Sequence, residues 1–178
     1  GYAGTGKDTL ARKFMQSGFH HISLSDILRG HLKRHGKPIT RENLVELGNE
    51  LRTLHGGHIL ATVTINRMRP NKNYIITSIG RIDEINKLKK LEGFKLIFVD
   101  APLQKRFEII KKRGRENDPK TLEEFKILDQ KERTGGGVQY REFDNCKEHA
   151  DIIINNEGTL TEFNEKIKQL IQQTTQIK

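Results

Sequence analysis

The sequence is poor in several features that mark whole classes of protein. Among its 178 residues there is one cysteine, Cys146, and no tryptophan, and aromatic residues make up 6%. A single cysteine cannot form an internal disulfide or a cysteine metal cluster. No apolar run approaches the ~20 residues of a membrane-spanning helix, and no signal peptide is visible. We therefore expect a cytoplasmic protein with no membrane partner.

Positive charge, in contrast, is in excess. The formal net charge is +9, and charged residues make up 31% of the chain. A basic balance favours an anionic partner, either nucleic acid or a phosphorylated small molecule, although a lysine-rich soluble surface gives the same total. Because aromatic residues are few, stacking on single-stranded nucleic acid is poorly supported. Nucleic acid is thus a possible partner that the sequence does not favour.

Short apolar runs alternate with helical stretches along the chain. The runs are apolar on both faces, as strands buried between helix layers must be, and the alternation is typical of a parallel sheet with crossover helices. We therefore predict an α/β fold, a three-layer α/β/α sandwich in which residues 1–178 form a single domain. Strands are predicted over Phe19–Ser23, Asn73–Ile79, Phe94–Asp100 and Asp151–Ile154. Helices are predicted over Lys7–Gln16, Asp26–Arg34, Arg41–Leu54, Ile59–Met68, Ile82–Leu91, Leu103–Arg113, Thr121–Arg133 and from Thr159 onwards.

One polar stretch, residues 113–149, contains no clear strand. It includes three consecutive glycines, Gly135-Gly136-Gly137, and a helix start with the capping-box pattern Thr121-Leu-Glu-Glu124. The same pattern recurs at Thr159–Glu162 before the last helix. We interpret 113–149 as a small helical lid.

The first residues carry the strongest functional signal. Gly1-Tyr2-Ala3-Gly4-Thr5-Gly6-Lys7-Asp8-Thr9 matches G-x-x-x-x-G-K. Glycines let successive N–H groups point inward, the following helix presents the positive end of its dipole, and Lys7 can bridge terminal phosphates. A phosphate loop follows a central strand, so we expect a further strand before Gly1. The residues predicted to bind ATP here are Gly1, Ala3, Gly4, Thr5, Gly6, Lys7, Asp8 and Thr9.

Asp8 stands where Ser or Thr is usual. A hydroxyl at this position normally contacts Mg²⁺, and because Mg²⁺ prefers oxygen ligands, Asp8 and Thr9 are candidate ligands. Alternatively, Asp8 only favours the helix N-terminus electrostatically. Gly-Lys-Asp resembles the variant found in some P-loop kinases, phosphomevalonate kinase and phage deoxynucleotide kinase among them.

A second motif is His21-Ile22-Ser23-Leu24-Ser25-Asp26-Ile27-Leu28-Arg29. It resembles the stretch after the second strand of adenylate kinase and other nucleoside monophosphate kinases. The resemblance implies that Arg29 grips the acceptor phosphate, that Asp26 organises Mg²⁺ and its waters, and that Ser23 or Ser25 lies near the acceptor. The residues alone also fit a helix start, with Asp26 in its first turn and Arg29 on a solvated face.

Thr77-Ser78-Ile79-Gly80-Arg81 follows the next predicted strand. It resembles the turn of the same family that ends in an arginine contacting phosphates, which implies that role for Arg81. Thr77-Ser78 replace the acid usual at the strand end. Asp26 is then the best acidic candidate, with Asp100 second, although a turn-forming role suits Asp100 better.

Two further segments are assigned by resemblance. Kinases of this fold use lid arginines to neutralise the transferring phosphoryl group, which implies this role for Arg113 and Arg115, although a solvated basic face fits equally. Residues 150–160 resemble the corresponding segment of dephospho-CoA kinase, which implies that Asn156 and Gly158 lie near the base of ATP. Alternatively, Asn156 and Gly158 only form a tight turn.

These inferences combine into one expected activity. We expect an ATP- and Mg²⁺-dependent kinase that transfers the γ-phosphoryl group to a nucleotide-like anionic acceptor, a nucleoside or deoxynucleoside monophosphate. One alternative is phosphorylation of a hydroxyl, as in dephospho-CoA kinase. Another is a nucleotide-binding switch or an assembly ATPase that works on RNA or ribosomes. The expected catalytic residues are Lys7, Asp26, Arg29, Arg81, Arg113 and Arg115, and the expected metal ligands are Asp8, Thr9 and Asp26.

Overall fold

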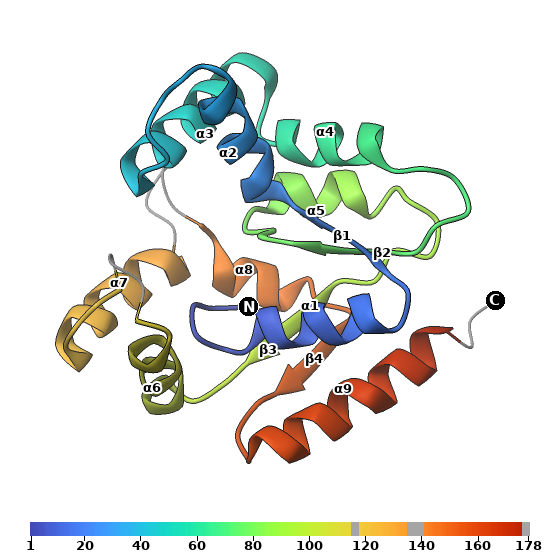
Figure 1. Cartoon of the computed structure of the whole chain (residues 1–178), viewed down its shortest axis with the longest axis vertical. Coiled ribbons are helices and arrows are strands. Elements are labelled where there is room, and N and C mark those ends of the chain that lie inside the picture. The colour runs from blue at the N-terminus through green and yellow to red at the C-terminus, as the bar shows by residue number, and fades with distance from the viewer. Residues whose placement is uncertain (115–117, 135–140, 176–178) are drawn as a thin grey trace.

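A computed structural model describes residues 1–114, 118–134 and 141–175, which form an α/β fold (Figure 1). The strands are β1 (His20–Ser23), β2 (Tyr74–Thr77), β3 (Ile97–Asp100) and β4 (Ile152–Asn155). The helices are α1 (Lys7–Gln16), α2 (Leu24–Arg34), α3 (Arg41–His55), α4 (Ile59–Arg67), α5 (Ile82–Leu88), α6 (Leu103–Arg113), α7 (Leu122–Thr134), α8 (Phe143–Glu148) and α9 (Leu160–Thr175).

The strands pair in parallel, as predicted, because each is followed by a helix that returns the chain to the same end of the sheet. In the first pair His20 of β1 lies opposite Tyr74 of β2, and in the second Ile97 of β3 lies opposite Ile152 of β4. Within each pair the two strands therefore point their carboxyl ends the same way. The loops that follow those ends are where this class of fold binds ligands.

The strands pair in two groups. The described strands form two separate two-stranded ladders, β1–β2 and β3–β4. A groove of about 370 Å³ lies between β2 and β3, so those two strands are too far apart to pair. Gly1 contributes to its lining, so the groove lies where the strand leading into Gly1 was expected. The groove is mainly apolar, and its lining includes Leu10, Phe14, Ile75, Ile76, Phe98 and Val99.

Helices cover both faces of the strands, which confirms the predicted layers (Figure 1). On one face α1 and α9 pack on β3 and β4 through a cluster that includes Phe14, Val99 and Ile167. On the other face α5 and α8 contribute Ile85 and Phe143 to a second cluster. Helices α2, α3 and α4 share a third cluster with residues of β2 and the loop after it.

Local sequence signals set several boundaries. The backbone amide of Glu124 donates to the Thr121 hydroxyl (3.2 Å), and that of Thr121 donates to the Glu124 carboxylate (3.3 Å). The Thr159–Glu162 box closes in the same way before α9. Both predicted capping boxes are thus confirmed. In the described ranges, no helix is both long enough and apolar enough to cross a membrane.

Candidate functional site

The loop before α1 adopts a conformation that its glycines alone allow. Gly4 and Gly6 have φ values of 76° and 98°, a region that L-residues with a side chain rarely adopt. A Cβ atom on Gly4 would lie 2.4 Å from the carbonyl oxygen of Arg106, and one on Gly6 would lie 2.9 Å from the side chains of Asn156 and Phe163. The loop is therefore pressed against α6 and α9 without side chains in between. This produces a cradle of main-chain atoms at the positive end of α1.

Lys7 folds back over this loop. Its ammonium donates to the carbonyl oxygen of Tyr2 (2.5 Å), which also accepts a hydrogen bond from the Thr5 hydroxyl (3.1 Å). Burial, followed by the positive charge of Arg141, lowers the pKa of Lys7 to about 8. A desolvated cation beside other cations is strongly drawn to an incoming anion. The loop and Lys7 thus fit a polyphosphate, as the motif predicted.

The turn after β4 supports the loop from the other side. The Asn156 amide group donates to the carbonyl oxygen of Thr5 (3.0 Å), and the Lys105 ammonium donates to the Asn156 side-chain oxygen (2.7 Å) and to the carbonyl oxygen of Gly158. Asn156 and Gly158, predicted to lie near the base of ATP, are thus beside the phosphate loop. Lys105, which sequence reasoning missed, joins them to α6.

Hydroxyl groups take the place of an acid at the carboxyl ends of β1 and β2. The Oγ atom of Ser23 lies 2.9 Å from those of Ser25 and Ser78, and the latter two are 3.2 Å apart. Ser78 has a φ of 66°, which turns its side chain towards β1. The Arg29 guanidinium donates to the Ser25 hydroxyl (2.8 Å) and pairs with Asp26 (2.7 Å). The motif residues of this side therefore do come together.

The predicted metal ligands lie at two helix N-termini. Asp8 and Thr9 are in the first turn of α1, and Asp26 is in the first turn of α2, where 61% of its side chain is exposed. Within the described part of the chain, no cluster of three or more histidine, cysteine or acidic side chains could hold a metal ion. This donor set does not form a complete protein cage. It fits Mg²⁺ held by one or two protein groups together with phosphate oxygens and water.

Two partly buried arginines lie near the acceptor side. Arg81 pairs with Glu142 (3.3 Å), and Arg52 pairs with Glu84 (3.3 Å), whose other carboxylate oxygen accepts from the Gly80 amide (3.0 Å). Burial raises the pKa of Glu84, although the Gly80 bond and Arg52 oppose this. Buried charges that are paired in this way keep their geometry. Arg81 and Arg52 thus stand in fixed positions beside the turn after β2.

Arg141 is a candidate that sequence reasoning missed. The backbone amide of Glu142 donates to the Gly80 carbonyl (2.9 Å), and a Cβ atom on Gly80 would lie 3.0 Å from the Arg141 side chain. The Arg141 guanidinium lies 5.4 Å from the centre of the Phe143 ring. Since its charge also lowers the pKa of Lys7, Arg141 lies within electrostatic reach of the phosphate loop.

The two predicted lid arginines, Arg113 and Arg115, have different outcomes. Arg113 ends α6 and forms a bidentate pair with Asp118, with its Nε 3.0 Å from one carboxylate oxygen. Its charge contributes weakly to the lowered pKa of Lys7. Arg115 lies outside the described residues. Asp100, the second acidic candidate, accepts from the Ala101 amide (2.8 Å) and pairs with Lys147 (2.6 Å), which fits its turn-forming role.

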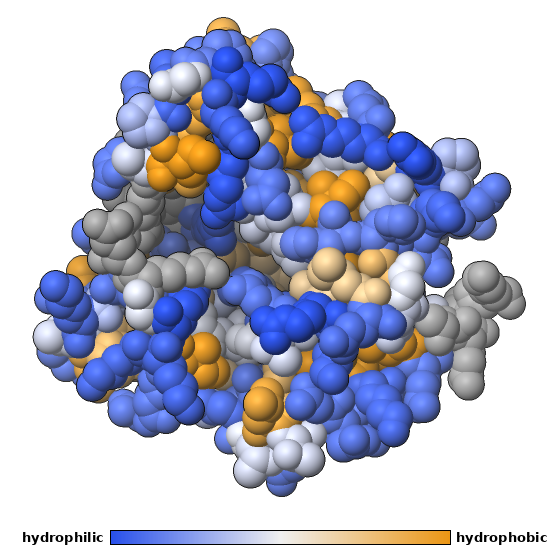
Figure 2. All heavy atoms as spheres, viewed as in Figure 1, coloured by the Kyte–Doolittle hydropathy of each residue, from blue (hydrophilic) through white to orange (hydrophobic). Residues whose placement is uncertain are grey.

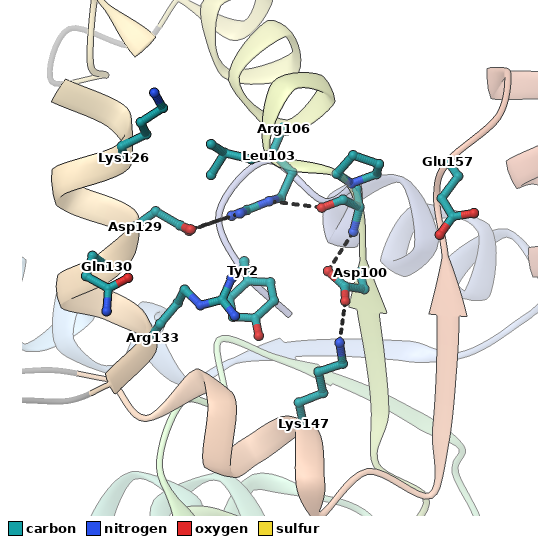
Figure 3. A pocket seen from close by; sticks show the side chains of 12 residues that line it. Tyr2, Asp100, Leu103, Arg106, Lys126, Asp129, Gln130, Arg133, Lys147 and Glu157 are labelled. Carbon is teal, nitrogen blue, oxygen red and sulfur yellow. Dashed lines mark hydrogen bonds and ion pairs between the residues drawn. The ribbon is translucent and has the colours of Figure 1, made fainter. Parts of the chain in front are cut away.

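The two sides of the site face each other. Figure 2 shows a largely hydrophilic face that is hollowed between the α2 region above and the α1 region below. A cavity of about 660 Å³ also lies beside the phosphate loop, between α6, α7 and α8 (Figure 3). Its lining is formed by Tyr2, Asp100, Ala101, Pro102, Leu103, Arg106, Lys126, Asp129, Gln130, Arg133, Lys147 and Glu157.

Comparison with known proteins agrees with this geometry. The family described as AAA domain matches residues 1–126, which include the phosphate loop, both serine-bearing turns and α6. The chain belongs to this family. Its fold and phosphate loop are accordingly those of a P-loop nucleotide-binding protein of the kinase-like type.

The chain also belongs to the UPF0200 proteins. It is 34% identical to the UPF0200 protein of Thermococcus sibiricus, with 97% of this chain and 91% of that protein covered. It is 33% identical to that of Hyperthermus butylicus, with 98% and 92% covered. A crystal structure of TT1252 from Thermus thermophilus is similar in fold, with a TM-score of 0.58 at 16% identity over 97% of this chain and 93% of that one.

Proposed function

We propose that the protein is an ATP-dependent kinase that phosphorylates the phosphate group of a nucleoside or deoxynucleoside monophosphate. The single observation that carries the proposal is the pairing of a phosphate cradle with a separate cation and hydroxyl cluster. The cradle contains Lys7, and the cluster joins Arg29 to Ser25 and its neighbouring serines. A transferase needs two anion sites that face each other, whereas a simple hydrolase needs one.

The donor side supplies position and charge. Lys7 would exchange the Tyr2 carbonyl for phosphate oxygens, which are stronger acceptors because they carry charge. Asn156, held by Lys105, keeps the loop in place while it is loaded. Bound Mg²⁺ would neutralise phosphate charge, with Asp8, Thr9 and Asp26 as the residues able to hold it or its waters.

The acceptor side favours a phosphate over an alcohol. A neutral hydroxyl acceptor needs a base to remove its proton, whereas an ionised phosphate needs cations that hold it in line. Around the ends of β1 and β2 the side chains are three serine hydroxyls with Arg29 and Arg81 nearby in sequence. Asp26, the acid closest to them in the motif, is engaged by Arg29. This arrangement suits an anionic acceptor better than an alcohol.

The segment after α7 would complete the site. Arg141 is fixed on the Gly80 turn and reaches electrostatically to Lys7. It therefore lies between the donor and acceptor sides, where negative charge develops during phosphoryl transfer. Arg113 and Arg115 remain predictions as lid arginines.

The test is ADP release by the full-length protein with MgATP and each of a panel of nucleoside and deoxynucleoside monophosphates, with dephospho-CoA as the alcohol arm. We expect turnover to rise sharply with one monophosphate. Arg29→Gln should raise the KM for that acceptor by about 10- to 100-fold, the value of a lost hydrogen bond to a charged group. Arg34→Gln, a basic and exposed residue on the same helix, is the matched control and should change KM less than twofold, by about the median of an exposed charge.

Two results would redirect the proposal. Turnover that responds to dephospho-CoA alone would move the reaction to a hydroxyl acceptor. Slow ATP hydrolysis that no small acceptor stimulates, but that RNA or a protein does, would make the protein a nucleotide-dependent switch.

A further inference from the structure

The second residue of the phosphate loop is held by three helices at once. The Tyr2 ring lies between two guanidinium groups, with the Arg106 Cζ atom 4.9 Å and the Arg133 Cζ atom 4.7 Å from its centre. Its hydroxyl donates to Asp144 (2.5 Å). Figure 3 shows Tyr2 enclosed among side chains from α6 and α7. A residue that served only to continue the loop would not need such an enclosure.

The arginines that flank Tyr2 are themselves fixed. Arg106 is 2% exposed and pairs through two nitrogen atoms with Asp129 of α7 (2.5 and 2.9 Å), while its Nε donates to the Ala101 carbonyl (3.1 Å). Arg133, also on α7, pairs with Asp144 (3.3 Å). Helix α7 therefore contributes twice to the contacts around Tyr2. It supplies Arg133, whose guanidinium lies over the ring, and Asp129, whose carboxylate anchors Arg106. We call this set of contacts the clamp.

The hydroxyl of Tyr2 remains a donor in this setting. Burial and the hydrogen bond to Asp144 raise the pKa of Tyr2 above its ordinary value. The phenol is therefore neutral at physiological pH, and its bond to the carboxylate is a charge-assisted one. Each of the three contacts ties the ring to an element that follows β3 in the chain.

The backbone of the same residue holds Lys7. The Tyr2 carbonyl oxygen accepts a hydrogen bond from the Lys7 ammonium at 2.5 Å. The ring held by Arg106, Arg133 and Asp144 and the carbonyl that accepts from Lys7 belong to the same residue and share its Cα atom, so the contacts that fix the ring also restrict where this carbonyl lies. Phe98 and Phe143 also contact the Tyr2 ring edge-on, with ring centres 5.1 and 6.0 Å away. These aromatic contacts would hold the ring in the core even without the two arginines.

We propose that Tyr2 is a positioning residue through which helix α7 sets the place of the Lys7 ammonium. The inference rests on the proposed function only in that Lys7 is taken to bind phosphate. A lid helix that moves would in this way adjust the phosphate loop from within.

The first test does not need a nucleotide. In protein with ¹³C-labelled lysine, the Lys7 side-chain signal, assigned with Lys7→Met, is compared between the wild type and Arg133→Leu, Tyr2→Leu and Tyr2→Phe. We expect the first two to shift the signal and to move the Lys7 titration upwards, because a released ammonium is better solvated. Tyr2→Phe keeps the ring between the guanidiniums and should shift it less. Phe98→Leu removes a ring that packs on Tyr2 but leaves the guanidiniums in place, and should leave Lys7 unchanged.

The second test is a double-mutant cycle on MgATP affinity measured by calorimetry. Arg133→Leu alone should change the MgATP affinity by about three- to tenfold, the range of a partly desolvated cation–π contact, because the clamp sets where Lys7 starts before it moves to the phosphates. In a Tyr2→Leu background the same change should have almost no effect, because the shared contact is already lost. Phe98→Leu combined with Arg133→Leu should be additive.

The outcomes distinguish the two proposals. An additive Tyr2–Arg133 cycle, or a Lys7 signal that only Phe98→Leu shifts, would overturn the positioning role. If the wild type bound no MgATP while the Lys7 signal still followed α7, the positioning role would stand and the proposed function would fall.

Discussion

Proton uptake on nucleotide binding is the sharpest consequence of the buried lysine. Burial, with a smaller contribution from Arg141, lowers the pKa of Lys7 to about 8. The ammonium form binds phosphate, and phosphate charge favours that form, so the pKa of Lys7 must rise in the complex. Binding is therefore strongest below pH 8 and weakens as the pH rises through about 8.

The size of the effect follows from this pKa. With a pKa of about 8 in the free protein, about one-tenth of Lys7 is neutral at pH 7 and about nine-tenths at pH 9. If Lys7 is charged in the complex, binding takes up about 0.1 proton at pH 7 and about 0.9 proton at pH 9. The affinity should fall by about tenfold between these two pH values.

The assay is calorimetric titration of MgATP in buffers that differ in ionisation enthalpy, at several pH values from 7 to 9.5. Lys7→Met is the control, and its remaining uptake should be flat with pH. Cys146 does not interfere, since burial raises its pKa to about 12. Uptake that does not grow between pH 7 and 9, or that is the same in Lys7→Met, would refute the placement of Lys7 on the phosphates.

Three further predictions concern the supports of the loop. Asn156→Ala should lower the free energy of unfolding by about 2 kcal/mol, because it leaves a buried carbonyl without its donor, as chemical denaturation can measure. Arg106→Leu should cost about 3–5 kcal/mol by leaving Asp129 buried and unpaired, whereas the double variant with Asp129→Leu should regain much of this; equal losses in both would contradict that account. Gly6→Ala should abolish MgATP binding, because its Cβ atom would lie 2.9 Å from Asn156, while Gly114→Ala, with a similarly positive φ but no neighbour closer than 3.9 Å, should leave affinity unchanged.

The fold was largely predictable because its signals are local. Apolar runs gave the four strands to within three residues at each end, and the two capping boxes marked the starts of α7 and α9. The phosphate loop was predictable for the same reason, since its glycines and Lys7 are consecutive. Helix α8 was not predicted individually, because Phe143–Glu148 is a short polar segment whose only strong apolar residues are Phe143 and Cys146.

The contacts between distant segments of the site could not be predicted from local sequence signals. Arg141 packs against Gly80, 61 positions earlier, within electrostatic reach of Lys7, and no local pattern links the two. Lys105 likewise joins Asn156 across 51 positions. Many arginines and lysines in the chain could be paired with a small residue on another element, so the sequence does not single out these two contacts. Only the three-dimensional structure identifies them.

The 141–142 segment links the donor and acceptor sides of the site. The phosphate loop rests on the β3–β4 half, where Gly1 approaches Val99 and Gly4 approaches Arg106. The serine cluster belongs to the β1–β2 half. Glu142 joins them, since its backbone amide donates to the Gly80 carbonyl and its carboxylate pairs with Arg81.

The donor and acceptor sides are linked in part by the Glu142–Gly80 backbone bond and the Arg81–Glu142 pair, beside the α5–α8 contact and the packing of α1 on β1 and β2. Phosphoryl transfer tolerates little misplacement of its two reactants. Weakening the Arg81–Glu142 pair should accordingly impair turnover more than it impairs the binding of either reactant alone, because each half keeps its own anion site. An Arg81→Gln variant with normal MgATP affinity and reduced kcat would have the signature of such a bridge, whereas a loss confined to acceptor KM would make Arg81 a simple phosphate ligand.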